Sequence, residues 1–217
     1  AQLSLVRLAG PTGCGKTQLL HLLSERGCQV LDLEGLAQHK GSALGEIPDQ
    51  AQPSQKYFES QLLDLLQRFD LSQPVWVESE SSRVGKIHCP KILWQKMKQA
   101  QPIQISAPRS ERVTFLIKQY DYFLANPERL KQCLEPLKKR HGIATLQHWH
   151  ELIEQQQWPL FVDQLLDSHY DIVYGGSLAE SAHSIRSQHY QLEDLSANGL
   201  AHFADFLASD AIKLTNQ

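Results

Sequence analysis

Short apolar runs alternate with longer amphipathic runs along the first half of the chain. Continuous apolar positions at residues 3–9, 29–33, 75–77 and 103–106 are typical of buried strands. Apolar residues spaced three and four positions apart in residues 17–26, 57–69 and 91–100 predict amphipathic helices between those strands. This alternation predicts a parallel sheet flanked by helices, which is an α/β fold.

The second half of the chain follows a different pattern. Residues 110–168 keep helical spacing, interrupted near Pro127, Gly142 and Pro159, and a last strand and helix are expected at 187–192 and 200–208. We therefore expect one domain over residues 1–217. Its core would comprise about residues 1–110 and 170–217, and residues 111–169 would form a helical lobe on that core.

One stretch between the predicted elements is unusually long and irregular. Residues 35–55 contain three Gly and two Pro with few apolar positions, which predicts a loop. Such a long loop inside a compact domain is usually functional or mobile. It is therefore a candidate ligand-binding segment.

Composition and charge exclude several classes of protein. With 41% hydrophobic and 21% charged residues, the chain is neither a disordered tail nor a coiled coil. It has no apolar run near the roughly 20 residues of a membrane span, and its four cysteines form no CxxC pair. Separate thiols of this kind predict a cytoplasmic protein. A net charge of -3 argues against coating nucleic acid over the whole surface, but it is compatible with a local basic face.

An eight-residue segment after the first predicted strand matches the phosphate-binding pattern GxxxxGK[ST]. Glycines let consecutive backbone N–H groups turn toward a phosphate, and the following helix directs its positive end at the same anion. The lysine of this pattern reaches phosphate oxygens and the hydroxyl suits Mg²⁺. We expect P-loop NTPase-like architecture, with phosphate bound by Gly10, Pro11, Thr12, Gly13, Cys14, Gly15, Lys16 and Thr17. The helix N-terminus could lower the thiol pKa of Cys14, but this loop position accepts many residue types, which favours no redox or nucleophilic role.

Acidic residues follow the second and third predicted strands. Glu78 comes directly after residues 75–77, where phosphate-loop proteins place a carboxylate that assists the metal, so Thr17 and Glu78 are a candidate Mg²⁺ site. A solvated acidic loop is the alternative for Glu78. Asp32 and Glu34 end the second strand at the same sheet edge, where they could orient an acceptor group or cap a helix.

Several cations are placed to meet the same anion or a nucleic acid. Arg83 and Lys86 follow the acidic strand end, and Arg112 opens the helix after the fourth strand. Each is a candidate phosphate contact, although Arg83 and Lys86 could instead pair with nearby acids. A denser basic run is a candidate tRNA-binding surface or a solvated helix face, and it consists of Lys131, Lys138, Lys139 and Arg140.

Several short segments of unusual sequence resemble segments of bacterial tRNA 2-selenouridine synthases, and they occur in the same order along the chain. They are residues 31–37, His39-Lys40-Gly41-Ser42, Leu44-Gly45, residues 52–55 with Phe58-Glu59, residues 77–81 with Arg83-Val84-Gly85, Arg112-Val113 and Tyr120. The resemblance covers residues 5–125 well and the helical remainder loosely. It is more specific than the phosphate loop alone.

The resemblance implies a transferase that replaces the sulfur of wobble 2-thiouridine in tRNA with selenium. Geranyl diphosphate first alkylates the sulfur, and selenophosphate then displaces the geranyl-thiol group. The phosphate loop would hold the diphosphate, with Lys16 stabilising its charge. A nucleoside triphosphate would then not be required, and the need for Mg²⁺ stays open. The candidates for catalytic residues are Asp32, Glu34, Glu78 and Arg83.

Full-length members of that family carry an N-terminal rhodanese-like domain whose cysteine serves selenium transfer. Nothing in residues 1–217 aligns with that domain, so we expect this chain alone to be incomplete for selenation, and no cysteine here inherits that role.

Two other functions fit the phosphate loop. If the chain is a small-molecule or nucleotide kinase, it should bind Mg-ATP tightly. If it is the transferase, it should prefer a prenyl diphosphate. A nucleotide-gated RNA-binding module predicts tRNA binding that ATP or GTP modulates without any product. The sequence does not decide the oligomeric state.

Overall fold

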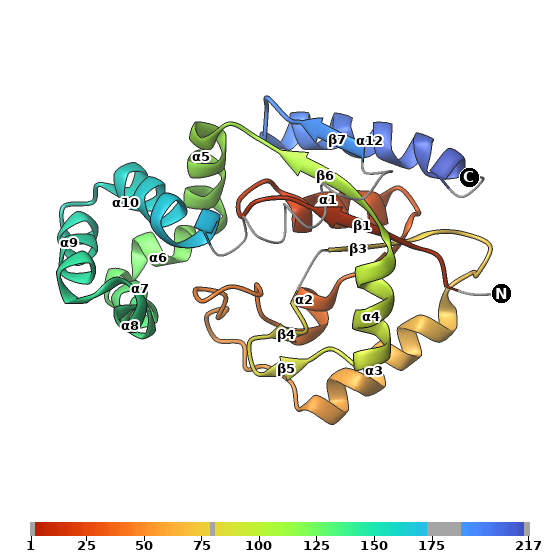
Figure 1. The fold of residues 1–217 in the computed structure, drawn as a ribbon, viewed down its shortest axis with the longest axis horizontal. Helices are drawn as coiled ribbons and strands as arrows, with labels where there is room; N and C mark the ends of the chain where they lie inside the picture. The colour runs from red at the N-terminus through yellow and green to blue at the C-terminus, as the bar shows by residue number, and fades with distance from the viewer. Residues whose placement is uncertain (1–2, 79–80, 173–187, 215–217) are drawn as a thin grey trace.

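A five-stranded parallel sheet forms the centre of the molecule (Figure 1). The computed structural model describes the backbone of residues 3–78, 81–172 and 188–214, with side chains as far as residue 210. The strand order is β2-β3-β1-β6-β7, and each neighbouring pair is parallel. The predicted α/β fold is confirmed. The strands are β1 (Leu5–Ala9), β2 (Gln29–Leu31), β3 (Val75–Glu78), β6 (Gln101–Ser106) and β7 (Gln188–Gln191).

The central strands are buried on both faces, which explains their continuous apolar sequence. In β3, Val75, Trp76 and Val77 have no exposed surface. β1 lies between β3 and β6, with Leu5 opposite Val75 and Val6 opposite Gln101. Because parallel strands end at one edge, the segments that follow β1, β3 and β6 meet there.

Helices cover both faces of the sheet (Figure 1). On one face α1 (Lys16–Glu25) and α12 (Ala197–Leu214) share an apolar cluster with Trp76 and Ile103. On the other face α3 (Gln55–Arg68) and α4 (Lys91–Gln99) pack against Val75 and Val77. These helices agree with the predicted spacing, although α12 extends beyond the expected residues 200–208.

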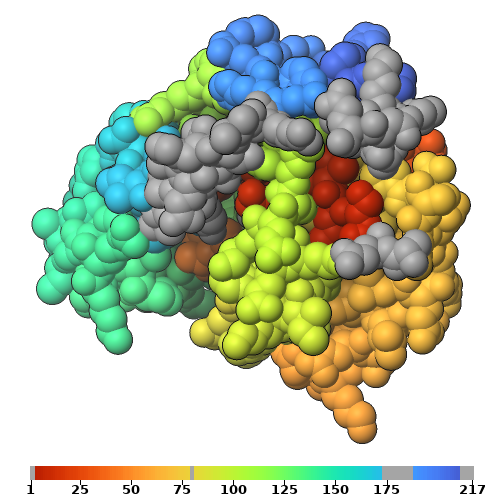
Figure 2. Space-filling view, turned by 45° about the vertical axis from the view of Figure 1, so that its right-hand side comes forward, coloured from red at the N-terminus to blue at the C-terminus, as the bar shows by residue number. Residues whose placement is uncertain are grey.

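The helices between residues 109 and 165 lie to one side of the sheet, and Figure 2 shows them at one end of the molecule. They share a separate apolar cluster that includes Phe123, Leu134, Trp149 and Phe161. The division into a core and a lobe within a single domain stays a prediction. The helices are α5 (Arg109–Gln119), α6 (Asp121–Ala125), α7 (Pro127–Leu134), α8 (Lys138–His141), α9 (Ile143–Glu154) and α10 (Trp158–Leu165), with short turns at Glu135–Leu137 and Leu166–Tyr170.

The expected loop at residues 35–55 is more structured than its sequence indicates. It begins within α2 (Leu33–Ala37), and a single bridge joins His39 to Glu46. A small hairpin, β4 (Arg83–Val84) with β5 (Ile87–His88), was also not expected. Such short elements carry too few residues to show a period. Within the described part of the chain, we find no helix with the length and apolarity of a membrane span.

Candidate phosphate site

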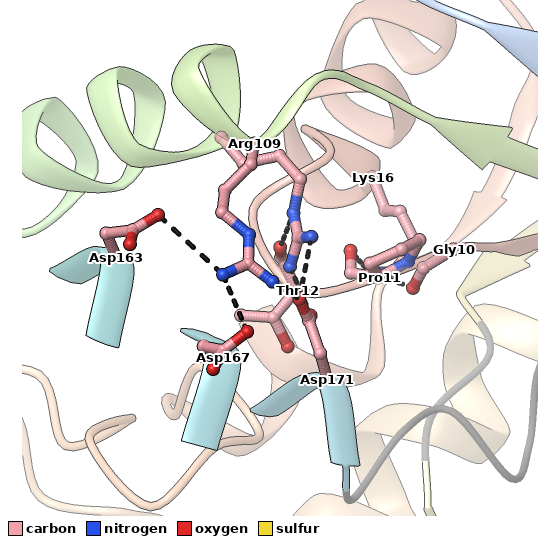
Figure 3. Close-up of polar contacts among 9 residues, drawn as sticks. Gly10, Pro11, Thr12, Lys16, Arg109, Asp163, Asp167 and Asp171 are labelled. Carbon is pink, nitrogen blue, oxygen red and sulfur yellow. Dashed lines mark hydrogen bonds and ion pairs between the residues drawn. The ribbon is translucent and has the colours of Figure 1, made fainter. Parts of the chain in front are cut away.

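The phosphate loop joins β1 to α1 and has the conformation that its glycines permit. Gly13 has a φ of 86°, in the left-handed region, and a Cβ there would lie 2.9 Å from the Leu116 side chain. Helix α1 starts directly after Gly15, so the free N–H groups of its first turn face the loop. The Lys16 ammonium lies back across the loop, donating to the carbonyl oxygens of Gly10 (3.1 Å) and Pro11 (3.2 Å) (Figure 3).

A cavity of about 260 Å³ opens beside this loop. Its walls come from the loop, from α2 and the segment that follows it, from the end of β3, and from α5. The structure thus brings together most of the predicted phosphate-binding residues and the acidic candidates. Those that line the cavity are Gly10, Thr12, Gly13, Gly15, Lys16, Thr17, Asp32, Glu34 and Glu78.

Hydrogen bonds fix the positions of two acidic candidates, Asp32 and Glu34. The Thr17 hydroxyl donates to Glu34 Oε2 at 3.3 Å, so Glu34 is the carboxylate that the phosphate-loop hydroxyl contacts. Asp32 caps α2 by accepting from the Gly35 N–H at 2.8 Å, and its other oxygen lies 3.0 Å from His21 Nε2. Of the two roles expected for Asp32, the structure shows helix capping. Glu78 is buried at the end of β3.

Lys40 is a cavity residue to which the sequence analysis gave no role. Its ammonium donates to the Gln119 carbonyl at 2.7 Å and lies 4.2 Å from the centre of the Tyr120 ring. Burial lowers the pKa of Lys40, while nearby Glu34 acts in the opposite direction. The sequence did contain one indication that Lys40 belongs to the site, because it lies in segment 39–42, which resembles the family. Lys40 therefore adds a second cation to the cavity that contains Lys16.

Arg112 contacts the phosphate loop through a backbone carbonyl group. Its Nε donates to the Thr12 carbonyl at 2.8 Å, and its Nη2 contacts Asp171 Oδ1 at 2.6 Å. Arg109, at a more exposed position, pairs with Asp167 at 2.8 Å and also contacts Asp171 at 3.3 Å. Arg112 is not among the described residues that line the cavity, so the structure shows a bracing contact to the loop. Its predicted contact with phosphate stays a prediction.

Arg83 and Lys86 lie on the exposed β4–β5 hairpin and not among the described cavity residues. Arg83 Nε donates to the Gly85 carbonyl at 2.6 Å within the hairpin turn. The Lys86 backbone N–H donates to Gln52 Oε1 at 2.7 Å. Their proposed contacts with phosphate, and the catalytic role considered for Arg83, stay predictions.

The pKa of the Cys14 thiol is raised rather than lowered. Cys14 is fully buried inside the loop, and burial raises the pKa of its thiol more than Lys16 and Arg112 lower it. Burial therefore outweighs any lowering of this pKa by the helix N-terminus. Cys14 packs in the apolar cluster beneath α1.

The basic run divides into two parts in the structure. Lys131 Nζ lies 2.9 Å from Glu128 and 2.8 Å from Glu154, so its charge is balanced within the lobe. Lys138, Lys139 and Arg140 are exposed on α8. These three residues are the part of the run that a polyanion could reach.

Comparisons with known proteins show which family the chain is similar to. A family model described as the tRNA 2-selenouridine synthase AAA domain matches residues 3–197. A tRNA 2-selenouridine synthase from Nitrosomonas europaea is 37% identical over 72% of this chain and 40% of its own length. One from a Shewanella species is 29% identical over 89% of the chain and 60% of its own length.

The chain thus spans about two to three fifths of the length of these curated relatives. A solved tRNA isopentenylpyrophosphate transferase from Bacillus halodurans aligns over both whole chains with 11% identity and a TM-score of 0.47, a likeness too low to support any conclusion. The match to the family model over residues 3–197 identifies the chain as a member of the tRNA 2-selenouridine synthase AAA domain family.

Proposed function

We propose that this chain is the alkyl-transfer part of an enzyme that modifies tRNA. It binds geranyl diphosphate at the phosphate loop and transfers the geranyl group to the sulfur of wobble 2-thiouridine, before selenophosphate completes the exchange. The names of the relatives support tRNA as the substrate. The observation that carries the proposal is that one cavity combines the phosphate loop with apolar wall residues, namely Ile47, Phe115 and Leu116.

The proposed reaction balances as a substitution at an allylic carbon. The thiocarbonyl sulfur forms a bond to C1 of the geranyl group, and the C1–O bond breaks with its electron pair leaving on the diphosphate. Loop N–H groups and Lys16 stabilise the charge of that leaving group. The N3 proton of the thiouridine is lost to water.

The charges around the cavity favour a divalent cation with the substrate. Lys16 and Lys40 share the cavity with three acidic side chains, Asp32, Glu34 and Glu78, so a diphosphate would enter a site where acidic groups outnumber lysines. No three metal-binding side chains are grouped among the described residues, but Mg²⁺ commonly uses one or two carboxylates together with substrate phosphates. The Thr17 hydroxyl and the carboxylates of Glu34 and Glu78 would hold it, and it would supply charge neutralisation.

Calorimetric titration with geranyl diphosphate and, separately, with Mg-ATP tests the proposal. We expect geranyl diphosphate to bind more tightly, with Mg²⁺ improving its affinity and Lys16→Ala weakening it at least tenfold. Lys56→Ala, which removes an exposed lysine on α3, is the matched control and should change nothing.

Tight binding of Mg-ATP with no binding of geranyl diphosphate would overturn the proposal in favour of a phosphoryl-transferring enzyme. Binding of tRNA that ATP or GTP alters, again without a prenyl diphosphate, would instead support the RNA-binding module.

A further inference from the structure

A second cavity lies inside the helical lobe, directly behind the wall of the phosphate site. It has a volume of about 60 Å³ and is lined by side chains from α5, α6, α7 and α10. Most of these are apolar, including Ile117, Phe123, Leu130, Phe161 and Leu165. Two tyrosines also line it, Tyr120 and Tyr170, and each has a hydrogen bond with the Ser42 side chain. Their polar atoms therefore have protein partners.

The two cavities share part of their walls. Thr12 of the phosphate loop, Leu116 of α5 and Tyr120 line both of them. The lobe cavity thus begins beside Thr12, whose carbonyl oxygen accepts a hydrogen bond from Arg112. A ligand whose phosphate end lies on the loop would thus have an apolar space next to it, past the shared residues.

We infer that the lobe cavity binds the far end of the hydrocarbon chain of an allylic diphosphate, an inference that rests on the proposed function. An apolar cavity excludes water and favours apolar ligands; a known example of about 150 Å³ accepts benzene. A cavity of about 60 Å³ is smaller, so it suits the branched terminal end of a prenyl chain. The proximal part of the chain would lie along Phe115 and Leu116. The polar edge of a nucleotide base would lose its hydrogen bonds there.

Chain length provides the test, with three ligands that share a diphosphate group. Calorimetry would compare geranyl diphosphate, dimethylallyl diphosphate and inorganic pyrophosphate. Each buried methylene strengthens binding about fourfold, so geranyl diphosphate should bind at least tenfold more tightly than its analogue one isoprene unit shorter. Val162→Phe, which places a larger side chain in the lobe cavity, should remove this preference while the affinity for pyrophosphate stays the same.

Leu160→Phe is the matched control, because Leu160 lies on the same helix but is 44% exposed and is not a cavity residue. It should keep the preference for the longer chain. A second readout needs no enlarged side chain: Trp158 lines the cavity, so its fluorescence should respond to geranyl diphosphate and not to pyrophosphate. Trp158→Phe, compared with the unsubstituted chain, assigns that signal.

The outcomes separate the two proposals. If geranyl diphosphate binds no better than pyrophosphate, the proposed function itself fails. If the preference for geranyl is present but Val162→Phe behaves like Leu160→Phe, the chain lies elsewhere and the lobe cavity is not its site. A Trp158 signal that pyrophosphate produces equally would also overturn the inference.

Discussion

A buried arginine connects the phosphate loop to the helical lobe. Arg112 is 5% exposed, and its guanidinium holds both the Thr12 carbonyl and the Asp171 carboxylate. Removing one partner of a buried ion pair is destabilising because the other charge is left without compensation. We therefore expect Arg112 to affect phosphate binding through the position of the loop.

We expect Arg112→Met to lower the free energy of unfolding by about 2–3 kcal/mol, less than for a fully buried pair because Asp171 is partly exposed. It should also weaken pyrophosphate binding severalfold. Arg109→Met removes a more exposed arginine from the same helix and should cost less than about 1 kcal/mol. Denaturant unfolding and calorimetry measure both effects. Equal losses in the two variants would show that Arg112 has no special role.

At the residue scale the sequence was most informative where a motif fixes the backbone. The phosphate loop was predictable because its glycines and Lys16 have a fixed spacing around an anion. Lys40 was not, because its position depends on the segment after α2 meeting α5. Sequence spacing alone carries no information about such a contact.

Among the elements, the segment after α2 and the β4–β5 hairpin hold each other in place. The His39 ring lies against Gly45 and Gly85, each of which would place a Cβ less than 3 Å from it. Gln52 Nε2 donates to the carbonyl oxygens of Ala37 and Val84, both at 3.0 Å. These contacts bring together segments that lie far apart in the sequence and that carry the family resemblance.

Gly85→Ala tests this packing. Gly85 has a φ of 59°, and an added Cβ would collide with the Gln52 side chain as well as with His39. Gly27→Ala is the matched control, because Gly27 also has a positive φ (79°) but no atom within 4 Å of the added Cβ. Thermal or denaturant unfolding should show a cost of about 1 kcal/mol for Gly27→Ala and about 3 kcal/mol for Gly85→Ala. The packing argument fails if the two costs agree.

The large elements were predictable and the small ones were not. The strand β3 is a continuous run of buried residues, and the helix α3 has apolar residues at helical spacing. The five-residue α2 depends on a side-chain cap from Asp32, and β4 and β5 have two residues each. These elements are stabilised by their neighbours, which a local pattern does not record.

Within the helical lobe, a histidine pair makes stability depend on pH. His169 is 8% exposed, and its Nδ1 lies 2.9 Å from His141 Nε2. Burial, with smaller contributions from nearby His141 and Arg140, lowers the pKa of His169 to about 4. An unfolded histidine titrates near 6.5. Between these values the unfolded chain binds the proton and the folded chain does not, so stability falls as the pH falls.

We expect the free energy of unfolding to decrease by about 2 kcal/mol between pH 7 and pH 5 through this group. His141, whose pKa burial also lowers, acts in the same direction. His169→Gln should make the dependence shallower in that range, above the pH at which carboxylates titrate. Denaturant unfolding at several pH values measures it. An unchanged slope in His169→Gln would contradict the assignment.

Over the whole molecule, charge is negative on balance but locally basic. The net charge is -3, yet Lys138, Lys139 and Arg140 lie together on the surface of α8. Lys131, which the sequence grouped with them, is engaged by Glu128 and Glu154. The cluster of three is therefore the candidate tRNA surface, and Lys131 is not expected to contribute to it.

Replacing Lys138, Lys139 and Arg140 together by Gln should weaken tRNA binding at every salt concentration. It should also reduce the slope of log K against log salt by about two to three, because each lost phosphate contact removes nearly one released ion. Lys131→Gln should leave that slope unchanged. Fluorescence anisotropy with labelled tRNA measures both variants. A triple variant with the original slope would place the tRNA surface elsewhere.

The most direct test of the proposed chemistry follows the transferred group. The chain would be mixed with geranyl diphosphate, Mg²⁺ and an anticodon stem-loop RNA carrying wobble 2-thiouridine, and the RNA analysed by mass spectrometry. We predict a geranyl group on the sulfur and release of one diphosphate per RNA, lost in Lys16→Ala and absent with a uridine stem-loop. No alkylation despite binding of geranyl diphosphate, or equal alkylation by Lys16→Ala, would contradict alkyl transfer at the phosphate loop.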